Sequence, residues 1–204
     1  RTFVIDTSPP TVTLAAVPTP SNDTSPSFSG TASDKEPVTV KVYRGTKAEG
    51  TTVATAEASV SSGKWGPVSS ATTLASGTYT AQAEEESSLG NPTGKSEART
   101  FVIDTSPPTV TLAAVPTPSN DTSPSFSGTA SEKEPVTVTV YKGAKAEGPP
   151  VATVQATVTG GKWGPVSSTT VLSSGEYTAR ASESSSLGNA DGKSEPRTFV
   201  INTN

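Results

Sequence analysis

The sequence predicts an all-β chain made of two tandem β-sandwich domains, because it repeats itself and because its apolar residues alternate. The string RTFVIDTSPP begins at Arg1 and again at Arg99, and RTFVINT begins at Arg197, so the period is 98 residues. The two repeats differ at 21 positions, and their first 33 residues are identical. Solenoid repeats have periods of roughly 20 to 50 residues, whereas one sandwich domain has roughly 100. The period therefore favours two complete domains.

The repeat divides the chain into three parts. We expect residues 1–6 to be the last strand of a preceding repeat, residues 7–104 to be the first domain, and residues 105–204 to be the second. Only residues 105–108, Thr-Ser-Pro-Pro, connect the last strand of the first domain to the next domain. The two prolines favour an extended backbone. We therefore expect the domains to join end to end with a small interface.

Seven strands are expected in the first repeat, separated by Gly, Pro, Ser or Asn turn signals. They are placed near residues 11–17, 26–33, 37–44, 52–60, 64–74, 78–86 and 97–104. The third shows the clearest pattern, because Val38, Val40 and Val42 share one face of an alternating segment. On the other face, Lys41 becomes Thr139 in the second repeat, whereas the three valines recur. This pattern is typical of a half-buried strand.

The fourth strand alternates in the same way. Small apolar residues occupy positions 54, 56, 58 and 60, while the intervening Glu57 and Ser59 become Gln155 and Thr157 in the second repeat. Substitution at the intervening positions suits an outward orientation, and retention of apolar residues at the others suits an inward one.

The fifth and sixth strands each contain one large aromatic residue. Trp65 and Trp163 are the only tryptophans, one in each repeat, and each is expected to fill one core rather than to bind a ligand. Tyr79 and Tyr177 open the sixth strand after a glycine, where a tyrosine corner places a hydroxyl that bonds a neighbouring loop. These details favour an immunoglobulin-like topology. The predicted fold class is thus all-β, with two tandem immunoglobulin-like β-sandwich domains of about seven strands each.

Composition excludes most enzyme classes and several kinds of partner. The chain has no Cys, His or Met, so it lacks a thiol nucleophile, a histidine base and the usual zinc or haem ligands. Its net charge of −4 gives no basic footprint for nucleic acid. No apolar run reaches the 18 or more residues of a membrane span. We expect no enzyme activity, no nucleic-acid partner and no membrane insertion in this segment.

Four stretches of the first repeat resemble the tandem bacterial Ig-like repeats of surface adhesins and secreted repeat proteins. They are GTASDKEPVTVKVYRG, GKWGPVSS, LASGTYTAQAEEESSLGN and FVIDTSPPTVTL. One departure is that such repeats usually carry Asp before the loop that ends in Gly-Asn, whereas this chain has Glu84 to Glu86 and, in the second repeat, Ser182 to Ser184. The resemblance implies an extracellular or cell-surface stalk, with neighbouring repeats as its partners, and nothing catalytic.

Three short motifs suggest chemistry but have simpler interpretations. Gly94-Lys95-Ser96 imitates the end of a phosphate-binding loop, but the spacing from Gly90 is one residue short and a strand follows. Glu84 to Glu86 could supply paired catalytic carboxylates, yet the second repeat keeps only Glu183 and adjacent strand residues face opposite sides. We expect a solvated strand end there. Asn22-Asp23-Thr24 matches a glycosylation sequon, and we expect a turn built by its side chains.

The function that fits best is a structural stalk or spacer that holds a distal tip away from the cell. A stalk needs the same part repeated, and the two repeats are nearly identical. The alternative is an extracellular module that binds carbohydrate or a host protein. Sugar recognition usually needs exposed aromatic residues, but only 5% of the chain is aromatic, and Tyr43 and Tyr141 are the only ones expected to point outward.

The resemblance also suggests calcium at the junction between the domains, because related surface repeats often use calcium to stiffen this joint. Carboxylate and amide oxygens are the ligands that calcium prefers. The candidate ligands are Asp104, Glu132, Glu134, Asn189 and Asp191. The alternative is a joint stiffened by prolines alone, with solvated acids around it. No other cofactor is expected.

Overall fold

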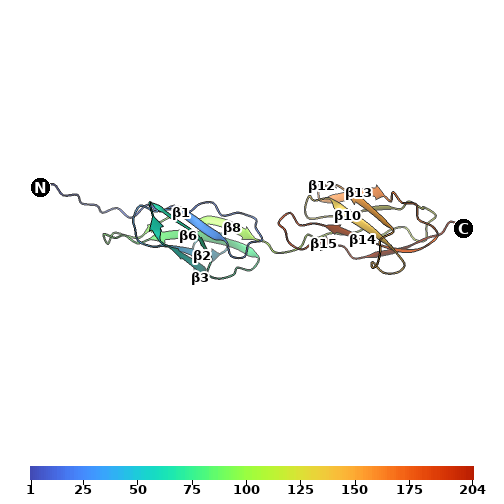
Figure 1. The fold of residues 1–204 in the computed structure, drawn as a ribbon, viewed down its shortest axis with the longest axis horizontal. Coiled ribbons are helices and arrows are strands. Elements are labelled where there is room, and N and C mark those ends of the chain that lie inside the picture. The colour runs from blue at the N-terminus through green and yellow to red at the C-terminus, as the bar shows by residue number, and fades with distance from the viewer. The chain divides into compact units, whose positions relative to one another are not determined.

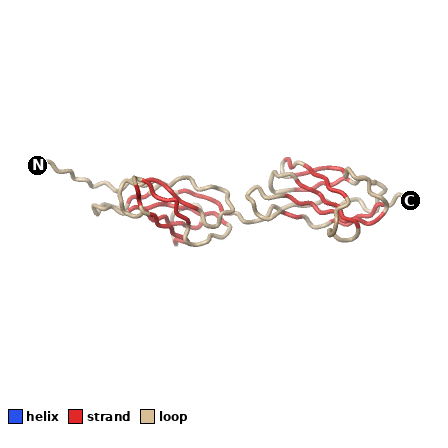
Figure 2. Tube along the Cα trace, viewed as in Figure 1, coloured by secondary structure: helices blue, strands red, loops and turns tan.

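The computed structural model describes residues 1–204, and every regular element in it is a β-strand (Figure 1, Figure 2). The chain divides into two compact units, Arg1–Thr105 and Ser106–Asn204. Each unit contains a hydrophobic core of its own. The prediction of an all-β chain with two tandem sandwich domains is confirmed.

The two units contain the same strands in the same order. The strands of the first unit are β1 (Ser27–Thr31), β2 (Val38–Arg44), β3 (Thr52–Ala58), β4 (Val60–Ser61), β5 (Lys64–Ser69), β6 (Gly77–Glu85), β7 (Gly94–Lys95) and β8 (Arg99–Ile103). Those of the second are β9 (Ser125–Thr129), β10 (Val136–Lys142), β11 (Ala152–Ala156), β12 (Val158–Thr159), β13 (Lys162–Ser167), β14 (Gly175–Glu183), β15 (Gly192–Lys193) and β16 (Arg197–Ile201).

Each unit is built from one three-stranded and one five-stranded antiparallel sheet. In the first unit the smaller sheet has the order β1-β5-β4. The larger has the order β3-β2-β6-β7, and β8 pairs with the other end of β6. The second unit repeats both orders with β9 to β16. The two sheets of each unit bury their inner faces against each other. In the first unit the outer face of the larger sheet carries charged side chains such as Lys41 and Glu84.

The alternation seen in the sequence determines which face of β2 is buried. Val38, Val40 and Val42 are 0% exposed, while the residues between Val38 and Val42 are only half-buried. The equivalent valines of β10 are also 0% exposed. Because side chains alternate along a strand, the intervening residues line the outer face of the five-stranded sheet.

The tryptophans lie in the cores, as predicted. Trp65 and Trp163 are each 2% exposed. The indole Nε1 of Trp65 donates to the carbonyl of Thr31, and that of Trp163 donates to the carbonyl of Thr129, both at 3.2 Å. Burial of a large ring and a partner for its only polar atom together explain why one tryptophan can anchor each small core.

Close packing around each tryptophan requires a glycine. A Cβ atom at Gly30 would lie 2.0 Å from the carbonyl oxygen of Thr13 and 2.8 Å from Cζ2 of Trp65. The same geometry occurs around Gly128 in the second unit, with Trp163 as the ring. Only glycine therefore lets the neighbouring backbone and the indole approach this closely.

The tyrosine hydroxyls bond loop backbones, as a tyrosine corner predicts. The Tyr79 hydroxyl donates to the carbonyl of Ala75 at 2.9 Å, and the Tyr177 hydroxyl donates to that of Ser173 at 2.9 Å. The Tyr79 ring also stacks on Phe101 of β8, with 5.9 Å between centroids. Each tyrosine thus fixes a loop at one end of β6 or β14 while its ring extends the core.

The first predicted strand, residues 11–17, is not a regular strand. Val12, Leu14 and Val17 are buried, and Val12 forms an isolated antiparallel bridge with Ala32. The Thr13 backbone N–H donates to the carbonyl of Thr31 at 2.9 Å, but the returning N–H of Thr31 donates to the Thr13 hydroxyl instead of a carbonyl. A side chain therefore replaces one bond of the ladder and interrupts the strand. The predicted fifth strand, residues 64–74, also ends early, at Ser69.

Residues 1–6 form no strand within the first unit. Phe3, Val4 and Ile5 are 80%, 90% and 75% exposed. Their copies in β8 behave differently, because Phe101 and Ile103 are 0% and 1% exposed in the core. The same short sequence is thus buried when it pairs with β6 and exposed where no strand of the first unit covers it.

Candidate functional site

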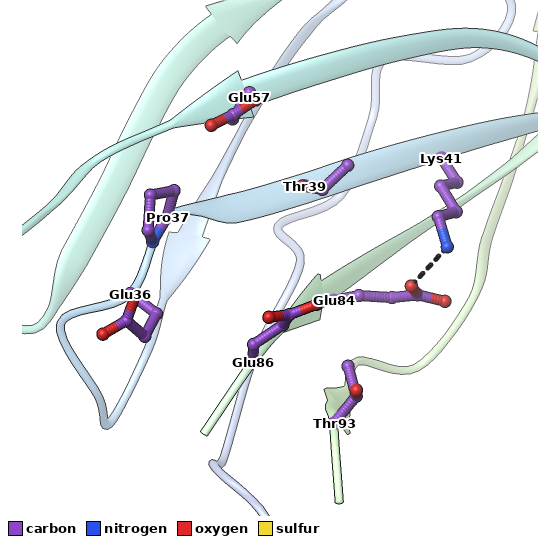
Figure 3. Close-up of a pocket in the computed structure, with 8 residues that line it drawn as sticks. All are labelled: Glu36, Pro37, Thr39, Lys41, Glu57, Glu84, Glu86 and Thr93. Atoms are coloured by element: carbon purple, nitrogen blue, oxygen red, sulfur yellow. Dashed lines mark hydrogen bonds and ion pairs between the residues drawn. The ribbon is translucent and has the colours of Figure 1, made fainter. Parts of the chain in front are cut away.

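An open pocket lined by several charged side chains lies on the outer face of the five-stranded sheet of the first unit (Figure 3). Its volume is about 510 Å³. It is lined by Glu36, Pro37, Thr39, Lys41, Glu57, Glu84, Glu86 and Thr93. The strands β2, β3 and β6 and the loops beside them supply these residues. Four carboxylates and one ammonium group therefore gather on one surface.

Glu84 lies between two lysines on this face. Lys41 Nζ is 2.6 Å from one of its carboxylate oxygens, and Lys95 Nζ is 2.9 Å from the other. Burial raises the pKa of Glu84, but the hydrogen bonds from Lys41 and Lys95 outweigh it, so the pKa lies below its usual value. The pKa of Lys41 is raised by the same hydrogen bond. These three residues form one ion-pair network across β2, β6 and β7.

The remaining carboxylates of the pocket have no such partners. Glu36, Glu57 and Glu86 are exposed and form no ion pair. Figure 3 shows Glu36, Glu57 and Glu86 around the pocket, away from the Lys41–Glu84 contact. The first unit thus presents an acidic outer face around one internally neutralised glutamate.

The same face of the second unit contains a small pocket lined by two cations and no acid. A pocket of about 180 Å³ is lined there by Thr139, Tyr141, Ala146, Arg180, Ser182 and Lys193. By alignment of the repeats, Arg180 replaces Gln82, Thr139 replaces Lys41 and Ser182 replaces Glu84. Lys193 retains the position of Lys95, Arg180 is a new cation, and the central carboxylate is lost. No ion pair joins either cation to the chain, and Nε of Arg180 is buried without a hydrogen-bond partner.

The prediction that residues 84–86 form a solvated strand end is wrong for its central residue. Glu85 is 0% exposed, and its counterpart Glu183 is 1% exposed. One carboxylate oxygen of Glu85 accepts from the backbone N–H of Asp34 at 3.3 Å, and the other has no partner. Glu183 has the same arrangement, with Glu132 as its donor at 3.4 Å.

Burial controls the ionisation of these two glutamates. The pKa of Glu85 is raised, first because burial disfavours the carboxylate, and then because the nearby charges of Asp34 and Glu36 repel it. The backbone N–H of Asp34 only partly opposes this. A sequence signal for the position did exist, since residue 85 continues the inward series of Ala81 and Ala83 and is the only glutamate of the three that recurs.

The five residues predicted to bind calcium occupy different environments. In the first unit, the Asp104 backbone N–H donates to the carbonyl of Ser21 at 2.8 Å. In the second unit, the Glu132 carboxylate accepts from the Ser186 backbone N–H and from the Ser185 hydroxyl at 3.3 Å. The Asn189 amide donates to the carbonyl of Ser106 at 2.9 Å. Glu134 and Asp191 are exposed.

The carboxylate oxygens of Glu132 therefore already accept hydrogen bonds within the second unit. No group of three or more His, Cys, Asp or Glu side chains in the structure is arranged to hold a metal ion. Calcium at Asp104, Glu132, Glu134, Asn189 and Asp191 stays a prediction.

The two remaining motifs have structural roles. Lys95 of the Gly94-Lys95-Ser96 motif pairs with Glu84, while Ser96 Oγ accepts from the Ala83 backbone N–H at 3.0 Å. The Lys95 side chain thus forms an ion pair with Glu84 on the neighbouring strand and does not line an anion-binding site. In the sequon, Asp23 accepts from the Ser25 backbone N–H at 2.9 Å, which is the expected side-chain turn.

The exposed aromatic platform considered for sugar binding is not present on the first unit. Tyr43 is only 8% exposed, although its place in the alternation of β2 predicts an outward ring. Tyr141 in the second unit is half-buried and lines the small pocket beside Arg180. Apart from Phe3, Val4 and Ile5, large exposed apolar side chains such as Leu89 and Val171 are separate from one another in the sequence.

Comparison with known proteins adds a family to this geometry. The profile of the bacterial Ig-like domain matches residues 19–105. No curated protein sequence matches the chain. None of the elements is a helix with the length and apolar character needed to cross a membrane.

Solved structures resemble the chain at low identity. A tetra-tandem repeat in the extending region of a large adhesion protein is 22% identical, with a TM-score of 0.40 over 95% of this chain and 49% of that chain. The I-band fragment I67–I69 of titin is 14% identical, with a TM-score of 0.46 over 95% of this chain and 66% of that one. The human OSCAR ligand-binding domain is 14% identical, with a TM-score of 0.35 over 94% of this chain and 98% of that one. The chain thus spans about half the length of the adhesion-protein structure.

The family match covers the strands β1 to β8, the tryptophan and the tyrosine corner of the first repeat. The second repeat has the same strand order and differs at only 21 of the 98 aligned positions. Residues 19–105 therefore belong to the bacterial Ig-like domain family, and with the second repeat the chain is a tandem pair of immunoglobulin-like domains.

Proposed function

We propose that this chain is a stalk or spacer segment of a bacterial surface or secreted adhesin-like protein, located outside the cell, which holds a distal tip away from the surface. The observation that carries the proposal is the retention of one complete core in each of two nearly identical units. Of the 21 positions that differ, only Ala56 is buried in the first unit, and Val154 replaces it in the second. Repetition of a self-contained part suits a spacer.

The chemistry of the outer surfaces supports a role without catalysis. The titratable groups with raised carboxyl pKa values, Glu85 and Glu183, are enclosed by the fold and reach no substrate. The charged pocket of the first unit holds one neutralised glutamate and solvated acids, with no nucleophile and base in hydrogen-bonding contact. The alternative, a carbohydrate-binding module, has little support because Tyr43 is buried.

We place the functional domains at residues 7–104 and 105–204, with residues 1–6 completing the sheet of a preceding repeat. The exposure of Phe3 and Ile5, compared with the burial of Phe101 and Ile103, supports this assignment. A chain lacking residues 1–6 should keep the unfolding midpoint of the intact chain, because these residues add no strand to the first unit. A clear loss of stability would show that they belong to it.

Small-angle scattering of the two-repeat chain tests the spacer proposal. A spacer requires an elongated particle whose maximum dimension grows by a constant amount with each added repeat. The matched comparison is a three-repeat chain made by appending residues 105–202 once more. A compact particle, or a dimension that does not grow with repeat number, would refute the spacer function and leave the binding module as the better explanation.

A further inference from the structure

We propose that the outer face of the five-stranded sheet in the second unit docks onto the corresponding face of the first unit in a second copy of this chain. The two faces have the same strand order, but the first carries acids without ion-pair partners and the second carries two cations without them. The contact would join neighbouring stalks side by side, which goes beyond the proposed spacer function.

The first step of the argument is the loss of a carboxylate between two cations. In the first unit, Glu84 forms ion pairs with Lys41 and Lys95 at 2.6 and 2.9 Å. In the second unit Ser182 takes the position of Glu84, while Lys193 remains and Arg180 supplies a cation from the adjacent position on the strand face. Arg180 and Lys193 are diagonal neighbours across β14 and β15, so one external carboxylate can contact both.

The second step is the state of the arginine. Nε of Arg180 is buried and has no hydrogen-bond partner, and the pocket around it contains no acidic residue. Ser182, in the position of the lost glutamate, donates to the carbonyl of Thr137 at 3.4 Å and does not replace the carboxylate. The guanidinium fork matches a carboxylate well, so this pocket favours an acidic side chain from outside the unit.

The third step identifies the source of that carboxylate. The first unit carries three acids without ion-pair partners, Glu36, Glu57 and Glu86, around its own pocket (Figure 3). They lie on the sheet face that carries Arg180 and Lys193 in the second unit. Charge complementarity between these acids and the two cations therefore favours the first unit of another copy, because Gln155 and Ser184 replace Glu57 and Glu86 in the second unit.

Acidic residues at the rim limit the register of the contact. Glu134 and Asp191 are exposed near the loop end of the basic face, where the first unit has Glu36 and Thr93. They would repel the incoming acids if the two faces met at that end. The contact is therefore centred on Arg180 and Lys193, with Glu57 as the acid nearest to the middle of the opposing sheet.

Sedimentation equilibrium of the intact chain tests the proposal. At about 0.05 M salt the wild-type chain should associate reversibly below about 1 mM, and at about 0.5 M salt the association constant should fall by about tenfold or more. Arg180→Glu should also lower it by about tenfold. The matched control is Lys162→Glu, which changes the net charge equally at an exposed position on the other sheet and should leave association near the wild-type value.

A charge swap provides the decisive variant. Arg180→Glu combined with Glu57→Lys restores the wild-type net charge and should recover association lost in Arg180→Glu, and circular dichroism should confirm that each variant is folded. The proposal is overturned if the wild-type chain stays monomeric or if Arg180→Glu and Lys162→Glu weaken association equally. It is also overturned if the double variant associates no more strongly than Arg180→Glu. It is also overturned if the chain stays monomeric while free glucuronate shifts the NMR signals of Arg180 and Lys193, because the face would then bind a free carboxylate.

Discussion

Truncation of Trp163 to alanine should destabilise the second unit alone, by roughly 3 to 5 kcal/mol. The side chain is 2% exposed and packs within the core cluster of its unit. Burying a ring of this size removes about 150 to 250 Å² from water, which at about 25 cal/mol per Å² corresponds to about 4 to 6 kcal/mol as an upper value. Loss of the 3.2 Å bond to the Thr129 carbonyl adds about 1 kcal/mol. Measured large-to-small substitutions in cores fall in the range of roughly 3 to 5 kcal/mol.

The remaining tryptophan makes the assay specific to one unit. In Trp163→Ala, fluorescence reports only Trp65 in the first unit, whereas circular dichroism reports both units. We expect urea to give a fluorescence transition near the wild-type midpoint and an earlier additional step by circular dichroism. Val171→Ala is the control, because Val171 is 72% exposed and its truncation should cost little. A loss below about 1 kcal/mol would refute the core role, and a parallel shift of both signals would refute independent folding of the units.

Three further predictions concern packing, ionisation and metal. Gly128→Ala should destabilise the second unit by more than the few tenths of a kcal/mol typical of a surface change, because the new Cβ would meet the Thr111 carbonyl oxygen. Urea unfolding checks this, with Val171→Ala at an exposed position as the comparison. Glu183 has a raised pKa, so its contribution to stability is greatest below the unfolded value near 4.5 and is lost as the pH rises through the folded pKa. Glu183→Gln should therefore gain stability relative to wild type as the pH rises, by up to about 1.4 kcal/mol per pH unit in that window, and a pH-independent difference would contradict this. If calcium binds at the junction, a chelator should lower the melting temperature and added calcium should restore it. If neither changes the melting temperature, the calcium prediction is wrong and the prolines alone stiffen the connection between the domains.

The features that the sequence could predict are those that depend on local alternation or on a single large residue. Val38, Val40 and Val42 define an inward face by themselves, and one tryptophan in each repeat leaves little choice of core anchor. The segment at 11–17 could not be assigned correctly in this way, because its irregularity depends on a hydroxyl of Thr13 bonding the backbone of Thr31. Alternation therefore locates apolar faces but does not reveal when a side chain replaces a ladder bond.

The candidate site was harder to predict because its parts are distant in the sequence. Glu84 forms an ion pair with Lys41, which lies 43 residues earlier in the sequence. The ion pair depends on the register of β2 against β6. The burial of Glu85 was visible in the alternation of its strand, but its charge favoured an exposed position. Tyr43 shows the opposite error, since an outward place in the alternation did not leave the ring exposed. Charge and position must be weighed together at such residues.

The same charge differences also affect which strands can pair between the repeats. The identical first 33 residues of the repeats make their strands interchangeable in principle, and near-identical tandem domains are prone to exchange during folding. In the native registers Lys41 of β2 lies opposite Gln82, and Thr139 of β10 lies opposite Arg180. Exchange of β6 for β14 would place Lys41 opposite Arg180 and would remove Glu84 from Lys41. Like charges directly opposite each other cost on the order of 0.2 to 1 kcal/mol, and the lost ion pair adds to that cost. Substitutions that leave both cores almost unchanged therefore give each repeat a preference for its own strands.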